Sequence, residues 1–119
     1  MFSGIVIHGD GIGRNFGFPT ANIECKIKKG TKVATGVFAA TIIIDKVKYN
    51  GALIVLSKGN SYKFEFHILD FDKNIYGKFV EVDLVQKVSE VERHDSIKEL
   101  VEKIKEDIEM VKEVFAGRY

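Results

Sequence analysis

The sequence predicts a mainly β fold, an antiparallel barrel or sandwich, with one long α-helix at its C-terminal end. Two patterns indicate this class. The first three-quarters of the 119 residues consist of β-branched runs separated by short polar turns. The last quarter has apolar residues at helical spacing. The length suits one domain over 1–119, with the barrel over about 1–94 and the helix over about 95–116.

The strand-like runs follow one another closely along the chain. The first, residues 5–7, comes before a glycine-rich segment, and the others are residues 36–44, 47–56, 62–69 and 78–88. The polar pair Asp45-Lys46 predicts a tight turn between the second and third runs. Several strands of this length with short turns are typical of a barrel or sandwich.

Side chains alternate strictly in the run from Lys63 to Ile68. We expect one face to enter the core and the other to face away from it. The expected core residues are Phe64, Phe66 and Ile68, and the outward residues are Lys63, Glu65 and His67. Glu65 is thus a carboxylate on a rigid strand, and by itself it is also compatible with an ordinary solvated glutamate.

The C-terminal helix is predicted from seven apolar residues that form one stripe: Ile97, Leu100, Val101, Ile104, Ile108, Val111 and Phe115. Ser96 and Glu99 have the spacing of a capping box, and Gly117 is a typical stop. We expect the stripe to pack on the barrel and the Lys- and Glu-rich remainder to face solvent.

The segment Gly9–Asn22 holds four of the eleven glycines, the only proline and one of the few arginines. Successive backbone N–H groups at glycines can form a concave anion site, and a guanidinium suits phosphate oxygens. The segment therefore suggests a phosphate and metal cradle, with a ligand-free hairpin as the alternative. It lacks the Gly-Lys-Ser/Thr ending of a P-loop and the third glycine of a dinucleotide fingerprint.

Composition narrows the class of protein. Lys and Arg number 18 against 17 Asp and Glu, which argues against nucleic acid as a partner. A single cysteine, Cys25, excludes an internal disulfide, and no zinc-ligand spacing occurs. No apolar run approaches a membrane span, and the first residues do not have the pattern of a signal peptide. We expect a cytoplasmic protein that is monomeric by default and does not bind membranes.

Several motifs together closely resemble the riboflavin kinase family in its bacterial and eukaryotic ATP-dependent type. They occur in the family's order and cover nearly the whole chain: Gly9–Arg14, Phe16–Asn22, Gly36–Phe38, Glu65–Asp72, Ile75–Gly77 and Ile104–Asp107. The resemblance implies a six-stranded antiparallel Greek-key β-barrel with one long C-terminal α-helix. It also implies a kinase that transfers the γ-phosphate of ATP, or of another nucleoside triphosphate, to the 5′-hydroxyl of riboflavin to give FMN and ADP.

The resemblance also implies roles for particular residues. Glu65 would be the catalytic base, and Thr20 and Asn22 would hold Mg²⁺. Nucleotide and phosphate binding would fall to Gly9, Gly11, Gly13, Arg14, Gly17, Phe18, Pro19, Thr20 and Asn22. Candidates for the flavin side are Asp70, Asp72, Tyr76, Arg93 and Asp107.

Two segments depart from the family pattern. Residues 56–62 form a shorter connection than is usual in relatives, and the family's Leu-Arg position is occupied by Ser89, with His94 in place of an aromatic residue. Arg93 is a candidate replacement for that arginine. The departures leave two alternatives open, a non-catalytic flavin- or nucleotide-binding domain and a kinase acting on another small acceptor. A single-strand nucleic-acid-binding barrel is disfavoured by the inward phenylalanines and balanced charge.

Overall fold

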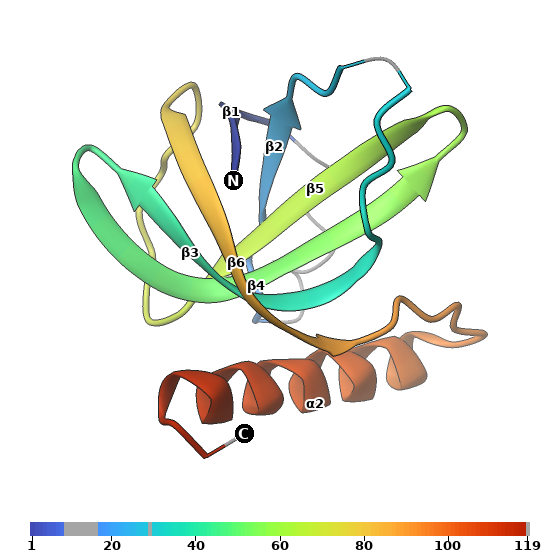
Figure 1. Ribbon diagram of the computed structural model, residues 1–119. Helices are drawn as coiled ribbons and strands as arrows, with labels where there is room; N and C mark the ends of the chain where they lie inside the picture. The colour runs from blue at the N-terminus through green and yellow to red at the C-terminus, as the bar shows by residue number, and fades with distance from the viewer. Residues whose placement is uncertain (9–16, 29, 119) are drawn as a thin grey trace.

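In the computed structural model, which describes residues 1–8, 17–28 and 30–118, six antiparallel strands close into a barrel and a helix lies along its outside (Figure 1). The elements are β1 Phe2–Ile7, β2 Ala21–Cys25, β3 Gly36–Ile44, β4 Val47–Lys58, β5 Ser61–Ile68, β6 Phe79–Ser89 and α2 Ile97–Phe115. Around the barrel the order is β1-β2-β5-β4-β3-β6. β3, β4 and β5 are neighbours both in the chain and in the barrel, and β2, which precedes them in the chain, lies beside β5. These four strands therefore form a Greek key.

The sequence patterns locate five of these strands but not β2. Ala21 and Asn22, which end the glycine-rich segment of the sequence, are the first residues of β2. This short strand pairs with β1 on one side and β5 on the other. Its position therefore depends on partners far away in the sequence, which its own five residues do not indicate.

The Asp45-Lys46 turn is confirmed as the hairpin between β3 and β4. Both residues have positive φ, 50° and 70°, the backbone conformation of a type I′ turn. The turn's twist matches that of the strands, so β3 and β4 stay in register from Ile44↔Val47 to Gly36↔Val55. The long pairing of β3 and β4 forms part of the sheet surface on which α2 packs.

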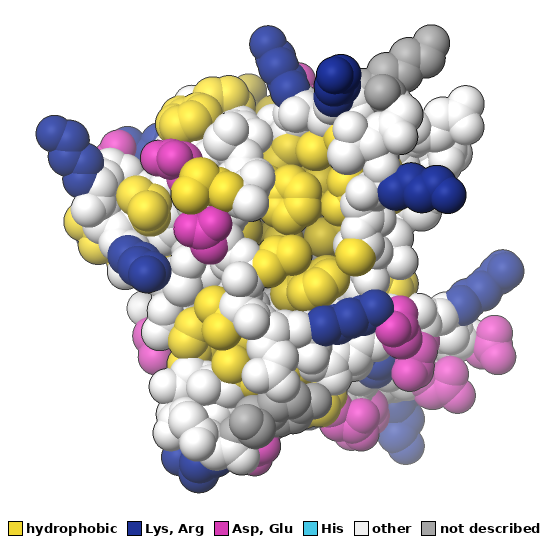
Figure 2. Space-filling view, in the orientation of Figure 1, with side chains coloured by type: hydrophobic (Ala, Val, Ile, Leu, Met, Phe, Trp, Pro, Cys, Tyr) yellow, Lys and Arg dark blue, Asp and Glu magenta, His cyan; other side chains and the backbone are white. Residues whose placement is uncertain are grey.

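The apolar residues form two layers. The barrel interior is filled with side chains from all six strands, and Phe64, Phe66 and Ile68 belong to it as predicted, at 2%, 1% and 6% exposure. In the space-filling view hydrophobic side chains occupy the opening at the centre of the face, while charged side chains lie around it (Figure 2). The barrel is therefore a packed core.

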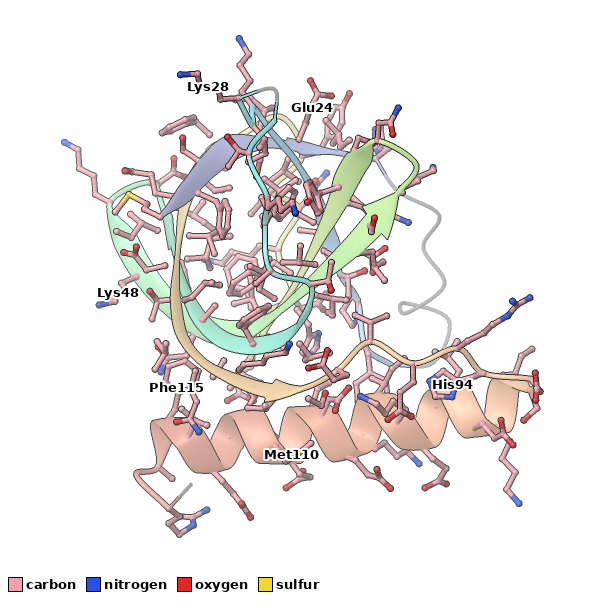
Figure 3. All side chains as sticks on the ribbon, turned by 45° about the vertical axis from the view of Figure 1, so that its right-hand side comes forward. Glu24, Lys28, Lys48, His94, Met110 and Phe115 are labelled. Carbon is pink, nitrogen blue, oxygen red and sulfur yellow. The ribbon has the colours of Figure 1, made fainter. Side chains whose placement is uncertain are left out.

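The second layer lies between the outer face of the barrel and α2. Val37 and Ala39 of β3 and Ala52 of β4 pack there against Val111, together with Val114 and Phe115 of the helix. Figure 3 shows Phe115 near the C-terminal end of the helix and His94 near its N-terminal end. Because β3 is covered by the core on one face and by the helix on the other, nearly its whole length is buried.

Both ends of α2 are capped as the sequence predicts. The Ser96 hydroxyl accepts a hydrogen bond from the Glu99 backbone N–H at 3.2 Å, and Glu99 Oε2 accepts one from the Asp95 N–H. At the other end, Gly117 has φ 74°, with hydrogen bonds from its N–H to Val114 and from the Arg118 N–H to Glu113. This is a Schellman motif, so the helix boundaries are set locally. No helix in the described ranges is both long and apolar enough to cross a membrane.

Candidate active site

Two pockets meet at Thr20. The first, which we call the loop pocket, has a volume of about 440 Å³ and is lined by the end of β1, the start of β2 and the connection after β5. The second, the helix pocket, has a volume of about 250 Å³ and lies between the outer barrel face and α2. Thr20 lines both pockets, so the two cavities share part of their wall at this residue.

The loop pocket has both polar and apolar residues in its wall. Its wall includes Asn22, Asp72, Asn74 and Tyr76. The Asn74 side-chain oxygen accepts a hydrogen bond from the Tyr76 backbone N–H at 2.9 Å, an Asx turn that shapes this wall. The Tyr76 ring stacks on His8 with centroids 3.8 Å apart and planes at 18°. The pocket thus combines hydrogen-bonding groups with a flat aromatic wall.

The helix pocket is mostly apolar, with polar groups at separate places in its wall. It forms where the N-terminal half of α2 faces β4 and β5, whereas the C-terminal half packs directly on the barrel. Its apolar wall includes Ile54, Leu100 and Ile104, and its polar groups include Glu65, His67, Lys103 and Asp107. An apolar slot with a few placed polar groups is the usual form of a small-molecule site.

Register brings the predicted base and the predicted metal residue together. Asn22 of β2 lies directly opposite Glu65 of β5, and the same row continues through Ile54 of β4 and Val37 of β3 to Ser89 of β6. Residues directly opposite across an antiparallel pair are on the same face. Glu65 and Asn22 are therefore neighbours on the outer face of the barrel.

Glu65 is held in position by a cation on its own strand. Lys63 Nζ lies 2.9 Å from Glu65 Oε1, with side-chain exposures of 30% for Lys63 and 18% for Glu65. The two residues share a face because they are two positions apart in β5. A carboxylate accepts hydrogen bonds at both oxygens, so this ion pair leaves acceptor capacity at Oε2.

His67 ties the Pro19–Thr20 turn to the strand that carries Glu65. Its Nδ1 lies 2.9 Å from the Pro19 carbonyl oxygen, and its ring meets Phe18 edge-on at 6.0 Å. Because a carbonyl oxygen only accepts, Nδ1 carries the proton in this contact. The distance between the turn and β5 is therefore fixed by a hydrogen bond as well as by strand pairing.

A divalent metal fits the residues at Thr20 and Asn22. Asn22 is buried at 6% exposure, and its Oδ1 has no hydrogen-bond partner within the part of the chain that the structure describes. Leaving such an acceptor unpaired costs free energy, which a cation ligand would offset. Mg²⁺ prefers oxygen ligands and takes few from protein when it also binds phosphates. No cluster of three His, Cys, Asp or Glu side chains occurs among the described residues.

The helix pocket also borders a buried polar triad. Lys103 Nζ lies 2.6 Å from Asp107 Oδ2 and 2.9 Å from Ser89 Oγ, and the Ser89 hydroxyl donates to Asp107 Oδ1 at 2.7 Å. The side chains of Lys103 and Asp107 are only 12% and 9% exposed. The expectation that the Lys- and Glu-rich face of α2 is solvated is therefore wrong for Lys103, which turns toward β6 together with Asp107.

The remaining predicted site residues are distributed as follows. Gly9, Gly11, Gly13 and Arg14 lie outside the described residues. Gly17 is exposed with φ 83°, and Asp70 and Arg93 line neither pocket, although Glu92 and His94 beside Arg93 line the helix pocket. Asp107 lines the helix pocket with Glu65, whereas Asp72 and Tyr76 line the loop pocket with Asn22.

Sequence reasoning missed His67, Ser89 and Lys103 as parts of the site. His67 had a signal, since it is two residues after Glu65 and thus on the same face. The i, i+4 spacing of Lys103 and Asp107 is compatible with an ion pair, but it does not indicate burial. Ser89 was recognised only as a departure from the family pattern.

Comparison with known proteins agrees with this architecture. The sequence model of the riboflavin kinase family, Flavokinase, matches residues 1–115. A bifunctional riboflavin kinase/FMN adenylyltransferase of Bacillus subtilis is 32% identical over 114 residues, which cover 90% of this chain and 36% of that protein. The chain thus spans about a third of the length of the curated relatives that it matches first.

Two solved structures share the fold. A Streptococcus pneumoniae protein described as a macrolide-efflux protein superposes with a TM-score of 0.82 at 30% identity, covering 93% of this chain and 38% of that one. Riboflavin kinase from Trypanosoma brucei superposes with a TM-score of 0.67 at 22% identity, covering 97% of this chain and 78% of that one. The barrel with its C-terminal helix is therefore a fold found in solved proteins.

Proposed function

The chain belongs to the riboflavin kinase family, and we propose that it phosphorylates riboflavin to FMN with ATP or another nucleoside triphosphate as donor. The observation that carries this proposal is the position of Thr20, which lines both the loop pocket and the helix pocket. Transfer of a phosphoryl group requires donor and acceptor to approach in line at one point. Two pockets that share one hydroxyl-bearing residue supply such a point.

The loop pocket suits the nucleotide. Its volume, its polar side chains and the Tyr76–His8 stack are compatible with a flat base and a polar phosphate chain. We accordingly assign Asp72 and Tyr76 to the nucleotide side rather than to the flavin side. Thr20 and Asn22 would hold Mg²⁺ against the phosphates, and the bound metal would neutralise charge on the transferring group.

The helix pocket suits the acceptor. Its apolar wall can take a flavin ring, and Glu65 on the same wall can receive the end of the ribityl chain. In the reaction, the 5′-hydroxyl oxygen forms a bond to the γ-phosphorus while the bond from phosphorus to the β-bridging oxygen breaks. The hydroxyl proton passes to the Glu65 carboxylate, and ADP and FMN remain. Lys63 keeps that carboxylate oriented.

The test is direct. The purified chain is incubated with riboflavin, magnesium and each of the four nucleoside triphosphates in turn, and the flavins are separated by chromatography. FMN formation with at least one donor, abolished by EDTA, supports the proposal and identifies the donor. Binding of riboflavin without conversion by any donor would favour the non-catalytic alternative. Conversion of another small alcohol in place of riboflavin would favour a different acceptor.

A further inference from the structure

The wall of the helix pocket holds a buried cation that no predicted role accounts for. Lys103 projects from α2 beside the end of β6, and its side chain is 12% exposed. An ammonium has three N–H donors, and the described contacts use two of them, to Asp107 and to Ser89. One donor therefore has no partner among the described residues.

The position of this cation along the sheet is defined by register. Ser89, which holds Lys103, is three strands away from Glu65 through Val37 and Ile54. At the usual spacing between strands this is about 14 Å along the sheet. The span between Lys103 and Glu65 thus has a polar group at each end and the apolar side chain of Ile54 between them.

That arrangement matches a long acceptor with a polar ring edge at one end and a hydroxyl at the other. Riboflavin has this form, since its ring carries carbonyl acceptors and its ribityl chain ends in the 5′-hydroxyl. The charge of Lys103 is balanced by Asp107, so an uncharged ring can bind beside it without leaving an isolated buried charge. An amine held at two points also loses little freedom when it donates to a ligand.

We propose that Lys103 is a binding and specificity residue for the acceptor. Its ammonium donates a hydrogen bond to a carbonyl oxygen of the flavin ring while the 5′-hydroxyl lies at Glu65. Ser89 and Asp107 act as positioning residues that hold the amine at the pocket wall. The proposal rests on the proposed function for the identity of the acceptor.

The experiment measures riboflavin affinity by the quenching of flavin fluorescence, independently of turnover. Lys103→Met is expected to raise the Kd for riboflavin about 10- to 100-fold, since a hydrogen bond from a charged group is lost. Lys103→Arg, which keeps a cationic donor, is expected to restore most of that loss. The KM for the nucleotide should stay within about twofold of the wild-type value, because Lys103 does not line the loop pocket.

Three further variants separate binding from folding. Lys105→Met removes an exposed lysine two positions away and should leave the Kd unchanged. Ser89→Ala removes part of the same triad but leaves the amine, so it should lower the melting temperature with a smaller effect on the Kd. If Lys103→Met does not fold because Asp107 is left unpaired, the double variant Lys103→Met/Asp107→Asn replaces it and should show the same rise in Kd.

An unchanged Kd in a folded Lys103→Met protein, or equal losses in Lys103→Met and Ser89→Ala, would overturn the proposal. In either case FMN formation by the variant would leave the proposed function standing. Failure of the wild-type protein to bind riboflavin would overturn this inference as well. Binding without FMN formation, combined with the expected loss in Lys103→Met, would reject the kinase while supporting Lys103.

Discussion

Asn22 and Glu65 lie directly opposite each other on the neighbouring strands β2 and β5. The pairing places a buried amide, whose Oδ1 has no hydrogen-bond partner in the described part of the chain, next to a carboxylate held by Lys63. Opposite residues in an antiparallel pair have Cα atoms about 5 Å apart. A metal ligand and a base so arranged would both reach a phosphoryl group at the junction of the two pockets.

Replacing Asn22 should weaken nucleotide binding without lowering the stability of the fold. Asn22→Leu removes a buried acceptor that has no partner among the described residues, so the melting temperature should stay the same or rise. Magnesium-dependent nucleotide binding should weaken by at least about tenfold, since one oxygen ligand is lost. Calorimetry with and without magnesium and nucleotide tests both effects. A stable variant with wild-type nucleotide affinity would contradict the role given to Asn22.

The His67 contact should matter for rate more than for folding. His67→Phe keeps a ring near Phe18 but loses the hydrogen bond to the Pro19 carbonyl, a net loss of about 1 kcal/mol in stability. The Thr20 turn is then less firmly held against β5, so kcat should fall while the fold persists. Steady-state kinetics beside a thermal melt measure the two effects. Equal kcat values in wild type and variant would show that the strand pairing alone positions the turn.

The single cysteine should react slowly in the folded protein. Burial raises the pKa of the Cys25 thiol from 9.0 to about 11, because the thiolate is poorly solvated there. At pH 8 the thiolate fraction is then roughly a hundredfold lower than for an ordinary thiol. Alkylation by iodoacetamide should be correspondingly slow and should keep accelerating as the pH rises toward 11. A plateau near pH 9 would contradict this environment, and the unfolded chain provides the control rate.

Loss of the helix cap should destabilise the chain modestly. Ser96→Ala removes the acceptor for the Glu99 N–H at the start of α2, a change that typically costs about 1 kcal/mol. Since the N-terminal half of α2 forms a wall of the helix pocket, the KM for riboflavin should rise with the loss of stability. Ser57→Ala, at an exposed position of β4, serves as a control. Chemical denaturation and riboflavin kinetics together test this coupling.

Local patterns predicted the elements whose signals are local. The alternation of Phe64, Phe66 and Ile68, the β3–β4 turn and the Ser96 cap all depend on residues close in sequence, and the structure confirms them. By contrast, β2 exists because β1 and β5 pair with it from distant parts of the chain. Its five residues alone carry too weak a pattern.

The sequence likewise predicted only part of the candidate site. The roles of Glu65, Thr20 and Asn22 are implied by the resemblance to a family. The sequence alone does not bring Asn22 and Glu65 together; the register between β2 and β5 does. Lys103 sits in a part of α2 that looks solvated by composition. Only the position of the helix over the end of β6 turns it toward Ser89 and Asp107.

We propose that Glu65 accepts the proton of the riboflavin hydroxyl during phosphoryl transfer. The most direct measurement compares FMN formation by wild type, Glu65→Gln and Glu24→Gln under saturating riboflavin, ATP and magnesium. Glu24 is an exposed strand glutamate that lines neither pocket, and in Figure 3 it lies at the end of the barrel away from the helix. Glu65→Gln should lose about 10²- to 10⁴-fold in kcat, and Glu24→Gln should retain wild-type activity. Equal activity of the folded Glu65→Gln protein and the wild type would show that Glu65 is not the catalytic base.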